Sequence, residues 1–367
     1  MGVVGSVRWL IISLQGLGDT IMLTPVVRSI AEEPGAQISL VVSDNGSWQY
    51  VESLGLQGVR SIYAWHERDG VLRNILRLRW QLLQTEFDVA VATYPAGRRE
   101  ALLLRMVRAR EKRIFRYYKG FFKSWQFLHP TARVADRWWH NVEANALLAG
   151  VGVVPPVAKV RAGMGGRPVI GVHIGGKGAS KRWDTRKFAE LMRRLHAEFR
   201  CHFVVFAGAE ELELVRTLRM ALAVPIEEVL GAPLLDVKHA LDKLTLLIGN
   251  DSSIAHLASV VGVPTVVIWS FAEFWRVSPY GYGNILIKKD YSCMPCYDFT
   301  KSYPLDCPFH LRCIRDITVD DVFDIAKRCI EVIMAGRLID ARDFAGIDRL
   351  RSCQQLGSGC VVLCIRS

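Results

Sequence analysis

A short polar stretch in the second half of the chain has the residue types that bind phosphate groups. Asp251, Ser252 and Ser253 directly follow an apolar run, and His256 stands about one helical turn later. A second apolar run, 266–269, comes soon afterwards. This order predicts a strand, a helix and a second strand, with the polar residues at the carboxyl end of the first strand. Ligands bind at that edge of parallel sheets and helix N-termini attract anions, so the stretch is a candidate phosphate site.

The same residues also have a purely structural explanation. Asp and Ser are favoured N-cap residues, so Asp251, Ser252 and Ser253 could do no more than begin the helix. His256 would then be a packed core residue. The two interpretations account for this stretch equally well.

A second candidate is a glycine turn near the N-terminus, Gly16-Leu17-Gly18-Asp19. It joins an apolar run to a segment with helical apolar spacing, 20–33. Gly-x-Gly after a strand opens the dinucleotide-binding pattern, and Asp44 near the end of the next strand could contact a ribose. The third glycine of that pattern is missing, because Ile21 stands in its place. The turn therefore argues against a nicotinamide or flavin enzyme.

Polar residues also follow two other predicted strands of the second half. A loop rich in glycine and cations, 175–183, contains Ser180 and Lys181. The apolar run 202–206 is followed closely by Glu210. Parallel strands present their carboxyl ends at one edge of a sheet, so these residues are expected to gather near the first candidate site.

The elements that would position these residues alternate between strand and helix along both halves of the chain. This alternation predicts α/β architecture with two Rossmann-like, doubly wound parallel-sheet domains. Breaks rich in glycine or proline at 150–156 and 163–166 place the boundary between them. We therefore expect an N-terminal domain at 1–160, a C-terminal domain at 161–336 and a tail of unassigned role at 337–367. Two similar halves facing one another would form a cleft suited to nucleotide-linked substrates.

The chain is basic, with 47 Lys and Arg residues against 36 Asp and Glu residues and a formal net charge of +11. This charge favours an anionic partner, which could be a phosphorylated substrate, a membrane surface or nucleic acid. Cations interleaved with aromatic residues are concentrated between Arg98 and Lys123. A solvated helix face explains part of this pattern, but a surface for anionic lipid or for a glycolipid acceptor explains more of it. The cations assigned to that surface are Arg105, Arg108, Lys112, Arg113, Arg116, Lys119 and Lys123.

Four of the nine cysteines are clustered as Cys293-x2-Cys296-x10-Cys307-x5-Cys313. In a reducing compartment such spacing indicates either metal binding or free thiols. Cys307 and Cys313 are too widely spaced for half of a zinc ribbon, so no metal is expected, with a structural zinc ion at the four cysteines as the alternative.

The sequence also bears on the compartment. The N-terminal stretch lacks a convincing signal-peptide cleavage site, and the uncharged apolar runs are too short for a membrane span. We therefore expect a cytoplasmic protein that can touch a membrane surface.

Three motifs, in this order and at this separation, make the chain resemble the bacterial lipopolysaccharide heptosyltransferases, glycosyltransferase family 9, of GT-B architecture. The resemblance covers about residues 7–335. The motifs are Gly16-Leu17-Gly18-Asp19, then Gly178-Ala179-Ser180-Lys181-Arg182-Trp183, then Asn250-Asp251-Ser252-Ser253-Ile254-Ala255-His256-Leu257-Ala258 with Gly262-Val263-Pro264.

The resemblance implies an inverting, metal-independent transfer of a heptose from ADP-heptose to a lipid A–core acceptor, by a protein that is peripheral on the inner face of the inner membrane. Asp19, next to Gly18 on the acceptor side, matches the family's general base, and a carboxylate there can take the proton of the attacking hydroxyl. Lys181 matches the family's phosphate-binding lysine, and Glu210 matches an acidic residue near the nucleotide sugar. A helix cap remains the alternative for Asp19, and a salt bridge for Glu210. The donor side as a whole is assigned to Lys181, Ser180, Glu210, Asp251, Ser252, Ser253 and His256.

On this interpretation we expect a monomeric chain that needs no cofactor beyond the donor and binds no nucleic acid. Three other functions compete with it: a non-catalytic GT-B protein that binds a nucleotide sugar or anionic glycolipid, a nucleic-acid-binding protein built on the basic segment, and an oxidoreductase. The non-catalytic protein would keep its nucleotide affinity and any phenotype after loss of Asp19. The nucleic-acid-binding protein would still bind single-stranded RNA after mutation of Lys181.

Overall fold

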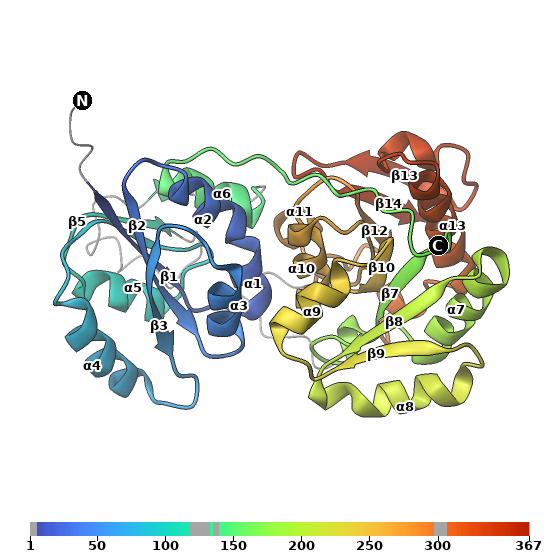
Figure 1. The fold of residues 1–367 in the computed structure, drawn as a ribbon, viewed down its shortest axis with the longest axis horizontal. Coiled ribbons are helices and arrows are strands. Elements are labelled where there is room, and N and C mark those ends of the chain that lie inside the picture. Colours follow the sequence, from blue (N-terminus) through green and yellow to red (C-terminus); the bar gives the residue numbers. More distant parts are fainter. Residues whose placement is uncertain (1–5, 117–132, 135–138, 297–306, 367) are drawn as a thin grey trace. The chain divides into compact units, whose positions relative to one another are not determined.

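The computed structural model describes residues 6–116, 133–134, 139–296 and 307–366, and the chain divides into two compact units (Figure 1). The first unit ends at Val154 and the second begins at Pro155. The boundary thus falls slightly before the predicted one. Residues 337–367, predicted as a separate tail, belong to the second unit.

The first unit is built on a parallel sheet with the strand order β3-β2-β1-β4-β5-β6. Neighbouring strands pair in parallel throughout this sheet, and β1 lies between β2 and β4, where the strand order reverses. Loops at such a reversal point are the usual ligand-binding position of doubly wound sheets. The strands are β1 (Val7–Ser13), β2 (Ala36–Ser43), β3 (Val59–Trp65), β4 (Phe87–Ala92), β5 (Ala109–Arg116) and β6 (Arg133–Val134).

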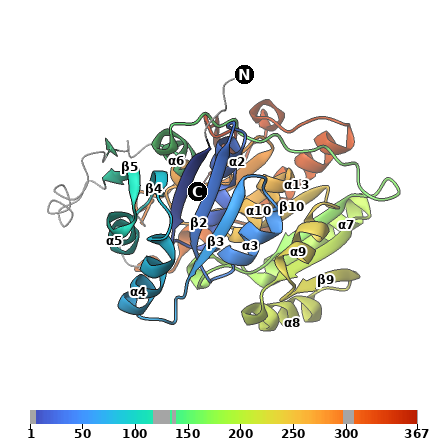
Figure 2. The ribbon, with the colours of Figure 1, turned by 60° about the vertical axis from the view of Figure 1, so that its left-hand side comes forward.

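Helices cover both faces of this sheet because its strands are apolar on both sides. Leu10 and Ile12 of β1 pack on one face with buried residues of two helices that lie side by side, α4 and α5 (Figure 2). The helices are α1 (Leu17–Met22), α2 (Thr24–Ala31), α3 (Ser47–Leu54), α4 (Val71–Leu82), α5 (Arg98–Met106) and α6 (Asn141–Ala149).

The second unit contains an eight-stranded sheet with the order β13-β14-β12-β11-β10-β7-β8-β9. All of its pairings are parallel except that between β13 and β14. β7 lies between β8 and β10, so the strand order reverses there as it does at β1. The strands are β7 (Val169–His173), β8 (His202–Ala207), β9 (Ile226–Leu230), β10 (Leu246–Asn250), β11 (Thr265–Ile268), β12 (Asn284–Lys289), β13 (Leu350–Gln355) and β14 (Val361–Ile365).

The helices of the second unit pack on its sheet through one large apolar core that includes α7 and α13. The α-helices are α7 (Thr185–Phe199), α8 (Leu212–Ala221), α9 (Leu234–Leu241), α10 (Ser253–Val261), α11 (Phe274–Val277), α12 (Arg312–Arg315) and α13 (Val319–Met334). Short 3-10 turns are η2 (Ala179–Lys181), η3 (Ala209–Glu211) and η4 (Ala341–Phe344).

The C-terminal strands β13 and β14 complete the second sheet. The strand β14 pairs in parallel with β12, and every residue of β14 is buried. Without it, the edge of β12 would expose a row of unpaired backbone groups and the apolar residues of the core beneath. Residues 337–367 are therefore a structural part of the second unit.

The predicted fold class is confirmed, since both units are doubly wound parallel sheets flanked by helices. None of the helices in the described ranges combines the length and the apolar character needed to cross a membrane.

Candidate active site at the ends of β7 and β10

Asn250, the last residue of β10, holds the glycine-rich loop that follows β7. Its amide nitrogen donates to the carbonyls of Ile174 (3.1 Å) and Gly175 (2.8 Å), and its amide oxygen accepts from the backbone N–H of Trp183 (3.0 Å). The side chain is fully buried. Because Trp183 is itself packed in the core, both ends of loop 174–183 are fixed against β10.

Lys181, at the end of that loop, forms an ion pair with Asp251. Its ammonium group donates a hydrogen bond to the Asp251 carboxylate and lies 6.0 Å from the centre of the Phe271 ring. The Lys181 side chain is 19% exposed and that of Asp251 is 6% exposed. A cation with part of its surface open, held at the start of α10, has the charge and position to meet a phosphate group.

His256 lies in the first turns of α10 and is kept neutral by its surroundings. Burial lowers the pKa of His256 to about 4, with the nearby Lys181 cation adding to the effect and Asp251 opposing it. The ring is 7% exposed, and its Nδ1 has no hydrogen-bond partner among the described residues. A neutral imidazole of this kind can donate or accept one hydrogen bond to a ligand without carrying charge.

Ser252 is the N-cap residue of α10, but its side chain does not cap the helix. Its hydroxyl lies 3.1 Å from Nδ1 of His173 instead. The backbone N–H groups at the start of α10 therefore receive no hydrogen bond from the Ser252 side chain, so the capping interpretation does not hold for Ser252. Ser253, the first residue of α10, is half-buried.

Glu211 is a site residue that the sequence prediction missed. Its carboxylate accepts from the backbone N–H groups of Gly176 (2.7 Å) and Gly208 (2.9 Å) and lies 3.6 Å from Nε2 of His173. Burial by itself would raise the pKa of Glu211, but the hydrogen bonds and charge of His173 and the two backbone donors outweigh it and lower the pKa to about 2. Glu211 thus joins the loops after β7 and β8.

Glu210, which was predicted instead, is exposed in η3. Its proposed contact with the ribose of the donor stays a prediction. The two neighbouring acids cannot be told apart by residue type. The sequence held one signal of a close approach at this point, the glycine pair Gly175-Gly176 after a strand end. In the structure, a Cβ at Gly175 would lie 1.9 Å from a carboxylate oxygen of Glu211, so that position has no room for a side chain.

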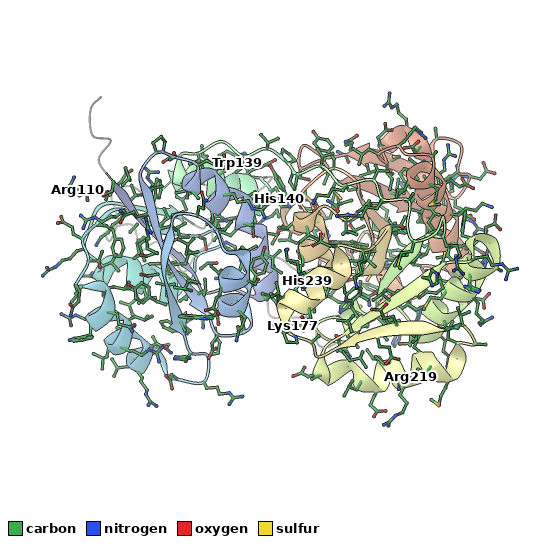
Figure 3. All side chains as sticks on the ribbon, in the orientation of Figure 1. Arg110, Trp139, His140, Lys177, Arg219 and His239 are labelled. Carbon is green, nitrogen blue, oxygen red and sulfur yellow. The ribbon has the colours of Figure 1, made fainter. Side chains whose placement is uncertain are left out.

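The remaining predicted donor residue, Ser180, lies on the same loop as two further cations, Lys177 and Arg182. Ser180 is buried in η2, next to Lys181. Arg182 donates from Nε to the carbonyl of Gly176 (2.8 Å) and so braces the loop. Lys177 is exposed on it and is labelled in Figure 3.

Asp19 lies in the first unit, in the turn that follows β1. It is the third residue of α1 and half-buried, and the N-cap of that helix is Gly16, so Asp19 is not the cap residue. The turn is held from two sides. Gln15 donates to the buried Glu100 (2.8 Å), and Thr20 donates to Ser47 (2.9 Å).

Asp44, considered above as a ribose ligand, already has partners. It accepts from the backbone N–H of Glu67 (3.0 Å) and lies 3.0 Å from Nδ1 of His66. The backbone hydrogen bond from Glu67, the desolvation that opposes it and the His66 contact together leave the pKa of Asp44 below its usual range. These two contacts fix the loop after β2 and give Asp44 a structural explanation.

Over its described residues, 98–116, the basic segment is a helix followed by a strand, α5 and β5, rather than one solvated helix face. Arg105 and Arg108 are exposed, as a lipid-facing role requires. Lys112 is half-buried and donates to the carbonyl of Arg105 (2.9 Å), and burial lowers its pKa. Arg113 does not fit the prediction: it is 18% exposed, pairs with Glu111 (2.7 Å) and donates to the last carbonyls of α6.

Three other predicted cations cannot be placed on that surface. The backbone of Arg116 ends β5, and its side chain lies outside the described residues. Lys119 and Lys123 lie outside them altogether.

The four clustered cysteines are free thiols. Burial raises the pKa of Cys313 to about 12, and the nearby Cys296, Cys307 and Cys293 add to the effect, so the four lie near one another. The described ranges contain no group of three or more His, Cys, Asp or Glu side chains that could hold a metal ion. Zinc at these cysteines stays a prediction.

Comparison with known proteins places the chain in a family. The family model described as glycosyltransferase family 9 (heptosyltransferase) matches residues 75–305, more than half of the chain. The chain belongs to glycosyltransferase family 9. The matched range contains Lys181, Asp251 and His256, and it ends before the strand β14 that completes the sheet.

Family 9 members with curated names or solved structures are similar to this chain. Lipooligosaccharide heptosyltransferase 2 of Campylobacter jejuni is 28% identical over 178 residues, 44% of this chain and 52% of that protein. The chain thus matches about half the length of that relative.

Two solved structures share the fold. A family 9 glycosyl transferase from Veillonella parvula has a TM-score of 0.69 at 17% identity, covering 88% of this chain and 97% of that one. The E. coli heptosyltransferase WaaC, determined with ADP, has a TM-score of 0.68 at 14% identity, covering 88% and 99%. At these identities the likeness establishes the GT-B fold of two Rossmann-like units.

Proposed function

We propose that this protein is a glycosyltransferase that moves a heptose from ADP-heptose to an inner-core sugar of a lipopolysaccharide acceptor. The observation that carries the proposal is the group formed by Lys181, Asp251 and neutral His256 at the point where the strand order of the second sheet reverses. Family membership supports the reaction class. The relatives support the sugar, the acceptor and the nucleotide, since one is named a lipooligosaccharide heptosyltransferase and another, also a heptosyltransferase, was solved with ADP.

The second unit is proposed to hold the donor. Lys181 and the backbone N–H groups at the start of α10 would contact the diphosphate, where negative charge grows as the sugar leaves. His256 would add a hydrogen bond, and Asp251 would aim the Lys181 ammonium group and bind sugar hydroxyls. Ser180, Ser252 and Ser253 would line the same cradle.

Asp19 is proposed as the general base. In a single displacement, the acceptor hydroxyl oxygen bonds to the anomeric carbon while the bond from that carbon to the diphosphate oxygen breaks. The hydroxyl proton passes to Asp19, ADP leaves, and the configuration at the anomeric carbon inverts. Because a lysine and backbone amides meet the leaving diphosphate, we propose that the step is independent of a metal ion.

The acceptor is lipid-linked, so we further propose that the protein works at the cytoplasmic surface of the inner membrane. Exposed Arg105 and Arg108 of the basic segment suit contact with an anionic surface.

The test is incubation of the purified chain with ADP-heptose and a core-truncated lipopolysaccharide, followed by mass measurement of the glycolipid. We expect the acceptor to gain the mass of one heptose, and NMR of the product to give the anomeric configuration opposite to that of the donor. If no ADP-, GDP- or UDP-linked sugar is transferred, but ADP-heptose binds with an affinity that Asp19→Ala leaves unchanged, the protein is a binding protein and the enzymatic proposal is wrong.

A further inference from the structure

The helix α4 carries apolar residues on two opposite faces. Ile75, Leu78 and Leu82 are buried against the first sheet. On the outer face lie Leu72, Leu76 and Trp80, which are 70%, 57% and 73% exposed. Figure 3 shows side chains projecting outward from this helix.

The outer apolar residues are spaced by four, so they form one stripe along the helix. We call Leu72, Leu76 and Trp80 the α4 stripe. Single exposed apolar residues are ordinary on protein surfaces, and Met220 of α8, 79% exposed, is an example here. Three large apolar side chains in register, one of them a Trp, go beyond that and mark a surface that contacts something.

Cations border the α4 stripe. Arg73, with 80% of its side chain exposed, and the exposed Arg79 flank it on its two sides. The helix itself contains no Asp or Glu, and the acid that precedes it, Asp69, pairs with Arg73 (3.4 Å) and Arg77 (3.1 Å). The helix α4 therefore presents an apolar stripe inside a positively charged border.

This combination fits the interfacial region of an anionic bilayer. Leu and Trp side chains enter the boundary between headgroups and acyl chains, Trp preferring that depth, while arginines remain among the phosphates. The neighbouring helix α5 contributes a further exposed cation, Arg105.

We propose that α4 docks the protein on an anionic lipid bilayer, inserting Leu72, Leu76 and Trp80 into the interface while Arg73 and Arg79 contact lipid phosphates. The inference rests on the proposed function for its purpose, since a lipid-linked acceptor is embedded in the bilayer. It moves the main membrane contact from the segment 98–123, where Arg113 is engaged inside the unit, to α4.

The first test is sedimentation of the full chain with vesicles of phosphatidylethanolamine containing about one third phosphatidylglycerol, compared with vesicles of phosphatidylcholine alone. We expect binding to the anionic vesicles that weakens at high salt. The triple variant Leu72→Ser, Leu76→Ser, Trp80→Ser should bind at least about tenfold more weakly, because the inserted apolar area is lost. Met220→Ser, which removes an equally exposed apolar side chain elsewhere, should bind like the parent protein.

Circular dichroism and the urea midpoint of the triple variant check that it is folded, which substitutions on the exposed face should permit. A variant with the single change Arg79→Gln should lose part of the preference for anionic vesicles. Vesicle binding that is the same in the triple variant as in the parent overturns the proposal. So does a parent protein that forms dimers dissolved by the triple variant and binds no vesicles, since the α4 stripe would then join two copies.

Transfer of heptose to a delipidated core oligosaccharide separates this inference from the proposed function. The triple variant should keep that activity while losing vesicle binding. A chain that binds vesicles through α4 but transfers no sugar would refute the enzymatic proposal and leave α4 as the docking helix.

Discussion

The ammonium group of Lys181 donates a hydrogen bond to the Asp251 carboxylate, which joins two loops that are 70 residues apart in the sequence. The pair lies where the loops after β7 and β10 come together, at the reversal of strand order in the second sheet. We expect this pair to have two roles, which are to stabilise the unit and to orient the Lys181 cation toward the donor.

These roles can be separated by substitution. Lys181→Ala should lower the free energy of unfolding by about 3 kcal/mol, because it leaves the 6%-exposed Asp251 carboxylate without its partner. The double variant Lys181→Ala, Asp251→Asn should recover most of that loss in urea denaturation and still bind ADP at least about tenfold more weakly than the parent protein. Recovery of ADP affinity in the double variant would show that Lys181 is structural only.

Asp19 is expected to act on the reaction and not on donor binding. Asp19→Asn keeps the shape and removes the base, so kcat should fall by about 10²- to 10⁴-fold. The affinity for ADP, measured by calorimetry, should stay within about twofold, since the donor residues belong to the other unit. The control is Glu33→Gln, which changes an exposed acid beyond α2 and should leave both quantities alone. An Asp19→Asn protein with full kcat would rule out the assigned base.

Glu211 should make the second unit sensitive to acid. Its folded pKa of about 2 lies below the ordinary value of 4.5, so the unfolded chain binds more protons between these values. The stabilisation is therefore complete above about pH 4.5 and is lost as the pH falls toward 2. Glu211→Gln should flatten the dependence of unfolding free energy on pH in this window, which urea titrations at several pH values measure. Glu210→Gln, at the exposed neighbour, should keep the dependence of the parent protein.

The strand β14 should be required for folding of the second unit. Leu363→Ala removes a fully buried side chain and should cost about 2–5 kcal/mol of unfolding free energy. Gln354→Ala, on the exposed strand β13, should cost no more than about 0.5 kcal/mol. Equal stabilities of the two variants in urea would mean that residues 337–367 are dispensable to the core.

Heptose transfer should not depend on a metal ion. Protein treated with EDTA and exchanged into metal-free buffer should keep its rate, because Lys181 and backbone amides are proposed to meet the leaving diphosphate. Metal content per chain should be measured by mass spectrometry on the same preparation. One zinc per chain, lost together with stability in a Cys293→Ser variant, would instead establish a structural metal at the cysteine cluster.

Much of the fold was determined by local sequence. Apolar runs separated by segments with helical spacing predict alternating strands and helices. A parallel strand that is buried on both faces is a nearly continuous apolar run, which makes it easy to recognise in the sequence. The same logic placed Asp251 at the edge of the sheet, because a polar residue that directly follows a buried strand must lie there, and it placed Lys181 in the loop that follows another strand. These positions depend on nearest neighbours in the chain, so one sequence suffices to find them.

Only the tertiary structure decided which of two residues of the same type is buried and engaged in a contact. Glu210 and Glu211 differ in whether the chain turns them toward Gly175, and Arg113 differs from Arg105 in facing the end of α6. The run 361–365 is a core strand because it pairs with the edge of β12. The outer apolar face of α4 could be recognised only after the structure showed which of its apolar residues are buried. Burial and pairing are set by what packs against a residue from distant parts of the chain, and the order of residues along the chain does not contain that information locally.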